Sequence, residues 1–236
     1  MTAVLDVKGL TAGYGHLAVV HDVSFGVASG EITALLGRNG AGKTTTLLAI
    51  AGFLADATGD VEIHGRKLTG PVYRRTAKDL GIVLEGRSVF PSLSVAKNLV
   101  VAGASVEGAL ELFPELEARL GIAAGMLSGG EQQMLSLARA LGRAPSVLLI
   151  DELSFGLAPI ITERIYARLR AVAESSGMAV VLVEQHLHVA AAACDVALVM
   201  NEGRVVLELS GGDLEARADE VERVYLGDSM AGTAEG

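Results

Sequence analysis

One eight-residue segment near the start of the chain constrains the fold most strongly. Residues 37–44, Gly37-Arg38-Asn39-Gly40-Ala41-Gly42-Lys43-Thr44, fit the pattern G-x-x-x-x-G-K-[ST]. The glycines of such a loop let backbone N–H groups close around phosphates, the lysine reaches the outer phosphates, and the threonine hydroxyl can hold Mg²⁺. The pattern has this meaning only between a strand and a helix. It therefore predicts a strand, a phosphate-binding loop and a helix, with a nucleoside triphosphate as the ligand.

The residues on either side of the loop supply that context. Residues 31–36, Glu31-Ile32-Thr33-Ala34-Leu35-Leu36, are mostly apolar and predict a buried strand, and residues 44–51 predict a helix. The amino end of such a helix directs its dipole at phosphate groups. We therefore expect Lys43 to bind phosphate, Thr44 to bind Mg²⁺, and Thr45 to lie with them in the nucleotide site.

Strand and helix patterns alternate along the rest of the chain. Short apolar or alternating runs predict strands at residues 3–8, 19–27, 60–65, 80–84, 146–152 and 178–184, and a hairpin at 196–207. Stretches rich in alanine, leucine and glutamate predict helices within residues 94–125 and at 131–141. This order predicts an α/β fold with a mainly parallel sheet covered on both faces. We expect one domain over residues 1–227, with a helical insertion at about 94–143 and a flexible tail at 228–236.

Composition argues against several classes of protein. The formal net charge is −9, aromatic residues make up 4% and Trp is absent, whereas nucleic-acid binding uses clustered Lys and Arg and stacked aromatic rings. We expect no nucleic-acid partner unless folding gathers a basic patch. Polar residues interrupt the most apolar region, 178–200, so no run approaches the roughly 18 apolar residues of a membrane helix. The start of the chain lacks a secretory pattern and Cys194 is the single cysteine, which fits a reducing cytoplasm.

A second segment narrows the choice among phosphate-loop proteins. Leu127-Ser128-Gly129-Gly130-Glu131-Gln132-Gln133 stands at the start of a predicted helix, where free N–H groups and the helix dipole favour an anion. A capping serine beside a glycine hinge would explain Ser128 but not the whole block. The segment resembles the signature sequence of ATP-binding-cassette (ABC) ATPases, and the similarity extends from Leu10 to Leu226.

This resemblance implies a fold and a shared site. The implied fold is the P-loop NTPase ABC cassette, with a RecA-like core, an antiparallel β subdomain and a short helical subdomain. The implied ligands are ATP and Mg²⁺. Ser128, Gly129, Gly130 and Glu131 are expected to face the γ-phosphate of ATP bound by a second ABC ATPase subunit, in a head-to-tail homodimer or heterodimer.

The resemblance also gives roles to four further side chains. Asp151 ends the apolar strand and is expected in the Mg²⁺ shell, while Glu152 is expected to orient the attacking water as general base. The alternative is that these two acids only mark a strand end at the surface. Glu85 stands where the family usually has glutamine and is expected beside Mg²⁺. Tyr14 matches the aromatic residue that stacks on adenine, with a tyrosine packed in a core or turn as the alternative.

Three other blocks are similar to one group within the family, the ATP-binding subunits of branched-chain (hydrophobic) amino-acid importers. The blocks are Glu85-Gly86-Arg87-Ser88-Val89-Phe90-Pro91, Gly156-Leu157-Ala158-Pro159 and Val183-Glu184-Gln185. This similarity implies two integral membrane permease subunits as partners, a peripheral position on the inner face of the cell membrane, and a permease contact at Val89-Phe90. The alternatives are a soluble ABC ATPase outside transport, an importer ATPase for a solute such as urea or amides, and a transporter regulator without turnover.

Three departures from the general ABC pattern leave questions open. The position of the family's switch histidine aligns with Gln185, and His186 comes one place later, so either residue is a candidate for contact with the γ-phosphate. Leu153 replaces the proline that normally follows the catalytic glutamate. The helical insertion is also shorter than in the family, and this lobe is the one expected to meet the membrane subunits.

Overall fold

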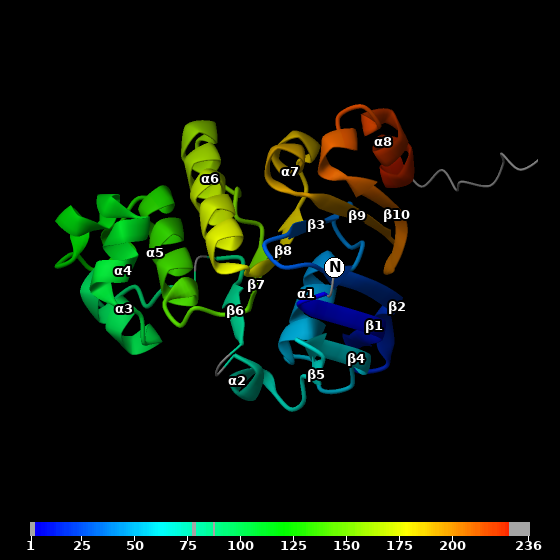
Figure 1. Ribbon diagram of the computed structural model, residues 1–236, viewed down its shortest axis with the longest axis horizontal. Coiled ribbons are helices and arrows are strands. Elements are labelled where there is room, and N and C mark those ends of the chain that lie inside the picture. Colours follow the sequence, from blue (N-terminus) through cyan, green and yellow to red (C-terminus); the bar gives the residue numbers. More distant parts are fainter. Residues whose placement is uncertain (1–2, 77–78, 87, 227–236) are drawn as a thin grey trace, which may run out of the picture.

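The computed structural model describes residues 3–76, 79–86 and 88–226, and its strands form two sheets (Figure 1). The smaller sheet is antiparallel, in the order β2-β1-β4-β5. Its strands are β1 (Leu5–Tyr14), β2 (Leu17–Val27), β4 (Thr58–Ile63) and β5 (Arg66–Lys67). The larger sheet has the order β10-β9-β3-β8-β7-β6. Its strands are β3 (Ile32–Leu36), β6 (Leu80–Val83), β7 (Val147–Asp151), β8 (Ala179–Glu184), β9 (Val196–Asn201) and β10 (Arg204–Ser210).

The central strands of the larger sheet are buried on both faces. Strands β6, β7, β8, β3 and β9 run parallel, and β10 pairs with β9 in the antiparallel sense. Successive side chains enter different hydrophobic clusters, so that in β7 Leu148 and Ile150 join one cluster while Val147 and Leu149 join the other. A strand covered on both sides needs apolar residues at every position, which explains the uninterrupted apolar runs in the sequence.

Helices cover the larger sheet on both sides (Figure 1). Helix α1 (Lys43–Ala51) contacts strands of both sheets and lies between them. The opposite face is covered by α5 (Gly129–Leu141), α6 (Pro159–Ser176), α7 (Leu187–Ala193) and α8 (Ala218–Leu226). The remaining helical segments are α2 (Val72–Arg75), α3 (Val95–Ala102), α4 (Val106–Leu112) and the 3₁₀ turns η1 (Pro114–Arg119), η2 (Ala124–Met126) and η3 (Gly211–Asp213). Helices α3 and α4, turn η1 and helix α5 pack on one another as a helical lobe.

The expected α/β fold with a mainly parallel sheet is confirmed, and each expected strand is present within a few residues. Helices α6, α7 and α8 were not expected from the sequence. The 18 residues of α6 carry a detectable signal, because its buried residues Ile165, Leu169 and Ala173 recur every four positions. The tail expected at 228–236 lies outside the described residues.

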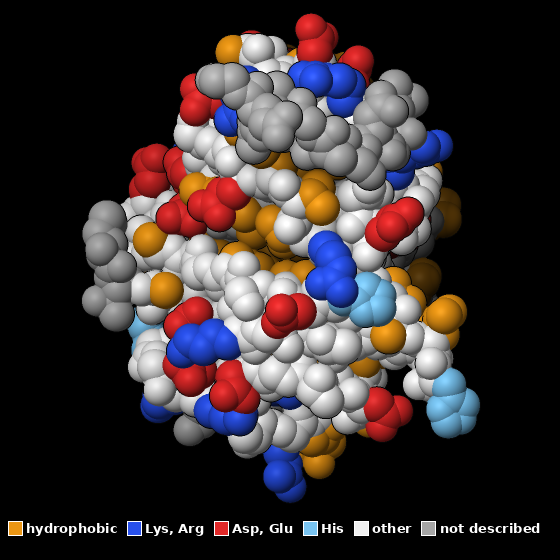
Figure 2. All heavy atoms as spheres, turned by 90° about the vertical axis from the view of Figure 1, so that its right-hand side faces the viewer, with side chains coloured by type: hydrophobic (Ala, Val, Ile, Leu, Met, Phe, Trp, Pro, Cys, Tyr) orange, Lys and Arg blue, Asp and Glu red, His pale blue; other side chains and the backbone are white. Residues whose placement is uncertain are grey.

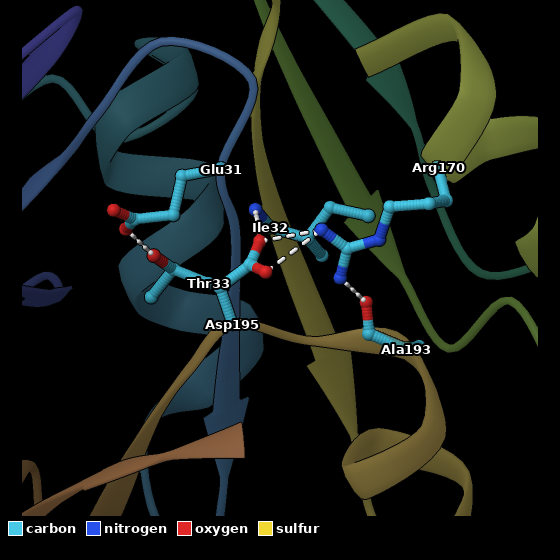
Figure 3. Close-up of polar contacts among 6 residues, drawn as sticks. All are labelled: Glu31, Ile32, Thr33, Arg170, Ala193 and Asp195. Carbon is cyan, nitrogen blue, oxygen red and sulfur yellow. Dashed lines mark hydrogen bonds and ion pairs between the residues drawn. The ribbon is translucent and has the colours of Figure 1, made fainter. Parts of the chain in front are cut away.

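A polar clip joins the amino ends of two strands to helix α6 (Figure 3). Arg170 Nη1 donates to both carboxylate oxygens of Asp195, at 2.8 and 2.7 Å, and its Nη2 donates to the carbonyl oxygen of Ala193 at 2.6 Å. Asp195 Oδ2 also accepts the backbone N–H of Ile32, the first residue of β3, at 2.8 Å. The clip therefore holds α6, the end of α7 and the start of β3 together, at the end of β3 opposite the phosphate loop.

One face of the molecule carries charges of both signs. On the face that carries β10 and the antiparallel sheet, acidic and basic side chains lie interspersed (Figure 2). Within the described residues, no helix has both the length and the apolar character needed to cross a membrane.

We expect Asp195→Ala to lower the free energy of unfolding by about 1–3 kcal/mol, because it leaves the buried N–H of Ile32 without an acceptor. Urea unfolding of the full chain measures this change. Asp56→Ala is the matched control, since Asp56 is exposed, and surface substitutions of this kind change stability by about 0.5 kcal/mol or less. Equal stability of the two variants would show that the clip does not stabilise the fold.

Candidate nucleotide-binding site

The phosphate loop joins the carboxyl end of β3 to α1, as the motif requires. Gly42 is the residue before the first turn of α1 and has φ +102°, a left-handed conformation that glycine adopts without strain. Gly37 has φ +153°, and a Cβ atom there would lie 2.5 Å from the carbonyl oxygen of Met200. Both positions therefore need glycine. Between them, Arg38, Asn39 and Gly40 are exposed while Ala41 is buried.

Lys43 lies over this loop. Its Nζ donates to the carbonyl oxygens of Gly37 at 2.7 Å and Arg38 at 3.1 Å, and the residue is only 5% exposed. Burial lowers the pKa of the ammonium group, while the nearby carboxylates of Glu152 and Asp151 act in the opposite direction. A buried cation at the amino end of a helix favours an anionic ligand such as a phosphate. Thr45, also expected in the site, is buried two residues further along α1.

Thr44 and Asp151 lie side by side at the same edge of the sheet. Thr44 Oγ1 donates to Asp151 Oδ1 at 3.2 Å, and Asp151 is 2% exposed at the end of β7. Burial raises the pKa of Asp151 to about 6, and the charges of Glu152 and Glu85 add to this effect, whereas the hydrogen bond from Thr44 and the charge of Lys43 oppose it.

These two side chains fit Mg²⁺. A hydroxyl and a carboxylate in contact supply the oxygen ligands that Mg²⁺ prefers, and this ion usually takes one or two carboxylates together with substrate phosphates and waters. Over the described ranges, no group of three His, Cys, Asp or Glu side chains is placed to hold a metal ion. Thr44 and Asp151 would therefore hold the ion together with the phosphates of a nucleotide.

Glu152 follows β7 and contacts Gln185 at the end of the neighbouring strand. Its φ is +51°, which is unusual for a residue other than glycine, and its backbone N–H donates to the carbonyl oxygen of Val183 at 3.1 Å. Strained conformations of this kind gather at functional sites, where the surrounding structure maintains them. The carboxylate of Glu152 accepts a hydrogen bond from the amide nitrogen of Gln185. The structure thus brings Asp151, Glu152 and Gln185 together.

His186 does not share this contact. It is exposed as the residue before the first turn of α7, and its ring centroid lies 5.9 Å from that of His188. Of the two candidates for the switch position, Gln185 is the one whose side chain contacts the proposed general base.

Glu85 lies near these groups, on the exposed loop after β6. It lines a cavity of about 230 Å³ together with Glu152, Phe155 and the helix α5 residues Gln132 and Gln133. Its charge also acts on Asp151, as the pKa of that residue shows. Arg87, in the same sequence block, lies outside the described residues.

The signature segment begins helix α5 with a capping box. Ser128 Oγ accepts the backbone N–H of Glu131 at 3.3 Å, and Glu131 Oε2 accepts the backbone N–H of Ser128 at 2.8 Å. The other carboxylate oxygen of Glu131 accepts from Arg119 Nε at 2.7 Å, and this contact lowers the pKa of Glu131. Glu131 is thus engaged in the cap, while Gly129 and Gly130 form the first turn. No hydrogen bond between described residues joins residues 128–131 to the phosphate loop of the same chain.

Tyr14 ends β1 at the turn before β2 and is 53% exposed. This exposure disfavours the alternative of a tyrosine packed in the core. The ring is available for stacking against a flat ligand.

Glu184 is buried beside the site, although no role was expected for it from the sequence. Glu184 is 1% exposed at the end of β8. Its carboxylate accepts from the backbone N–H of Ser154 at 3.3 Å, from Ser154 Oγ at 3.0 Å, and from the hydroxyl of Tyr166. Ser154 follows Glu152 by two residues, and Gln185 follows Glu184 directly. The sequence signal for these contacts was a charged residue at the end of an apolar strand.

Comparison with known proteins identifies the family. Residues 20–154 match the family described as ABC transporter. The chain belongs to the ABC transporter family. Members of this ATP-binding-cassette family hydrolyse ATP, and the chain is an ABC ATPase.

Two relatives of this ABC ATPase carry related names. It is 40% identical to the high-affinity branched-chain amino acid transport ATP-binding protein BraG of Pseudomonas aeruginosa, over 95% of this chain and all of the relative. It is 35% identical to the probable branched-chain amino acid transport ATP-binding protein LivF of Archaeoglobus fulgidus, over 87% of this chain and 91% of the relative.

Solved structures agree with the fold. The ABC ATPase matches the ATP-binding subunit of an ABC transporter with a TM-score of 0.80 and 28% identity, over 95% of this chain and all of that chain. It matches a dimeric bacterial ABC transporter cassette with a TM-score of 0.76 and 25% identity, over 87% of this chain and 98% of that chain. The expected P-loop ABC cassette is therefore confirmed.

We expect Glu152→Gln to leave ATP binding nearly unchanged and to cut hydrolysis by about 10²- to 10⁴-fold, the usual contribution of a positioned acid or base. Fluorescent-nucleotide binding and phosphate release are measured on one preparation. Glu111→Gln, on the helical lobe, is the matched control and is expected to hydrolyse ATP normally. Normal turnover by Glu152→Gln would remove Glu152 from the role of general base.

A second pair of variants separates Gln185 from His186. Gln185→Ala removes the side chain that contacts Glu152, so we expect hydrolysis to fall at least about tenfold, the lower range for loss of a group that orients the reacting atoms. His186→Ala, one residue away, is expected to stay within about twofold of the wild type. If His186→Ala is the slower enzyme, the histidine and not the glutamine acts at the γ-phosphate.

Proposed function

We propose that this chain is the ATP-hydrolysing subunit of an importer for branched-chain or related hydrophobic amino acids. The observation that carries the proposal is the 40% identity to BraG along the full length of that relative. The grouping of Asp151, Glu152 and Gln185 at the phosphate loop supports an active hydrolytic site, which disfavours a regulator without turnover.

In this proposal each residue of the site has a distinct task. Lys43 and the N–H groups of residues 37–44 bind the phosphates of ATP. Thr44 and Asp151 would hold Mg²⁺, which would supply positive charge beside the phosphates. Glu152 accepts a proton from the attacking water, and Gln185 holds the Glu152 carboxylate in place.

The proposed assembly has two cassettes and two permeases. Relatives in this family work as dimers with membrane permeases, and the exposed start of α5 leaves Ser128 available to the ATP bound by a second subunit. Tyr14 would stack on the adenine ring of the ATP bound by its own chain. The chain would be cytoplasmic and peripheral, on the inner face of the cell membrane. Binding of ATP to both sites would close the dimer, and hydrolysis would reset it.

Uptake of labelled solutes by the source organism tests the function. We expect deletion of the gene to reduce uptake of leucine, isoleucine and valine at least about tenfold, while urea uptake stays normal. The wild-type gene should restore uptake and Glu152→Gln should not, because hydrolysis is needed at each cycle. Loss of urea or amide uptake instead would change the proposed solute. Normal uptake of all these solutes would favour an ABC ATPase that acts outside transport.

A further inference from the structure

Glu184 is a buried acid to which the proposed reaction gives no task. It is 1% exposed at the end of β8, where it pairs in the parallel register with Leu36, the last residue of β3 before the phosphate loop. Acids are almost never fully buried unless they are paired, because removing their charge from water is costly. The burial of this acid beside the nucleotide site therefore indicates a task that an apolar residue would not perform.

Strand alternation sends Glu184 and Asp151 to opposite faces of the sheet. Leu182, two residues before Glu184, belongs to the hydrophobic cluster that helix α6 enters. Leu149, two residues before Asp151, belongs to the cluster that helix α1 enters. Asp151 therefore faces the helix that carries the other proposed Mg²⁺ ligand, whereas Glu184 faces α6. This placement separates the task of Glu184 from metal binding.

The carboxylate of Glu184 joins three segments of the chain. It accepts from the backbone N–H of Ser154 at 3.3 Å and from Ser154 Oγ at 3.0 Å, in the loop that connects β7 to α6. It also accepts from the hydroxyl of Tyr166, which is 7% exposed on α6. Hydrogen bonds to an ionised acceptor are stronger than those between neutral groups. One buried group thus fixes the end of β8, the loop after β7 and helix α6 relative to one another.

The loop that Glu184 holds begins with the proposed general base. Glu152 has φ +51°, and its carbonyl oxygen accepts the backbone N–H of Phe155 at 3.4 Å, so Ser154 lies inside a tight turn. A strained residue keeps its conformation only where the surrounding structure maintains it. Glu184 supplies a bond on each side: directly to Ser154, and through the backbone to Gln185, whose amide donates to the Glu152 carboxylate.

We propose that Glu184 is a positioning residue for ATP hydrolysis. Its carboxylate fixes the backbone on both sides of the Glu152–Gln185 contact, and Tyr166 ties this arrangement to α6. Glu152 is thereby held where it can accept a proton from the attacking water. A misplacement of about 1 Å at a reacting group can lower a rate by about 10²-fold. The inference rests on the proposed role of Glu152 as general base, and it does not depend on the transported solute.

Kinetics of two hydroxyl deletions test this role while the carboxylate stays in place. Tyr166→Phe and Ser154→Ala each remove one donor, so we expect kcat to fall by about three- to tenfold and Glu184→Gln to lower it further. Other groups bind ATP, so KM should stay within about twofold of the wild type. Ser154→Thr keeps the hydroxyl and should restore kcat. Glu174→Gln, at an exposed acid of α6, is the matched control.

The side-chain amide of Gln185 gives a readout that a purely structural role would not move. Its NMR signals are recorded on the ¹⁵N-labelled full-length chain and are assigned by their absence in Gln185→Ala. We expect the signals to shift in Tyr166→Phe, Ser154→Ala and Glu184→Gln, because the contact with Glu152 changes, and to stay in place in Glu174→Gln. A role in stability alone would lower the folded fraction and leave the signals of the folded chain unchanged.

Three outcomes would overturn the proposal. They are a normal kcat in both hydroxyl deletions, a kcat that falls only in proportion to the number of ATP sites per chain, and unmoved Gln185 signals in the slow variants. If Glu184→Gln does not fold, Tyr166→Phe and Ser154→Ala decide alone. Glu152→Gln tests the general base and solute uptake tests the proposed function, so failure here would leave both of those standing.

Discussion

The parallel register of β3, β8 and β7 is the constraint on which the site depends. Leu36 of β3 pairs with Glu184 of β8, and Val183 of β8 pairs with Asp151 of β7. The carboxyl ends of three buried strands therefore meet at one edge of the sheet. Because each strand continues directly into a functional segment, the register alone brings the phosphate loop together with the Asp151-Glu152 pair and Gln185, which lie more than a hundred residues later in the chain. Ligand sites at the carboxyl ends of parallel strands are the rule in open α/β sheets.

Glu184 links the end of β8 to the segment after β7 and to helix α6. One buried carboxylate bonds Ser154 beyond Glu152 and also Tyr166 on helix α6. Burying an ionisable group is costly unless its hydrogen bonds are satisfied, and here the described contacts satisfy it. Burial together with the charge of Glu184 raises the pKa of Tyr166 well above its usual value, so the tyrosine remains a hydrogen-bond donor. The segments on both sides of the Glu152–Gln185 contact are thus attached to the carboxylate of Glu184. Helix α6 is also held about one turn beyond Tyr166, where Arg170 pairs with Asp195.

The sequence predicted the parts of this arrangement that local patterns determine. The phosphate loop, the apolar strands and the cap at Ser128 each depend on a few adjacent residues, and each lies where it was expected. The contact of Gln185 with Glu152 could not be predicted, because it depends on how the chain leaves β8. Gln185 reaches Glu152, whereas His186 is the exposed cap residue before α7. The engagement of Glu131 by Arg119 was likewise hidden, since it joins η1 to α5 across the helical lobe.

The charges at the sheet edge oppose the stability of the fold. Burial lowers the pKa of Lys43 and raises that of Asp151 to about 6 from an ordinary value of 3.8. An acid whose pKa is higher in the folded than in the unfolded chain binds protons more tightly when folded, so its contribution to stability declines as the pH rises from about 4 to about 6. Hydrophobic residues in place of Lys43 and Asp151 would destabilise the fold less. Groups kept buried and charged against this cost are expected where a ligand supplies the missing partners: phosphates for Lys43, and a cation for Asp151. The electrostatics of the fold and the chemistry of MgATP therefore indicate the same residues.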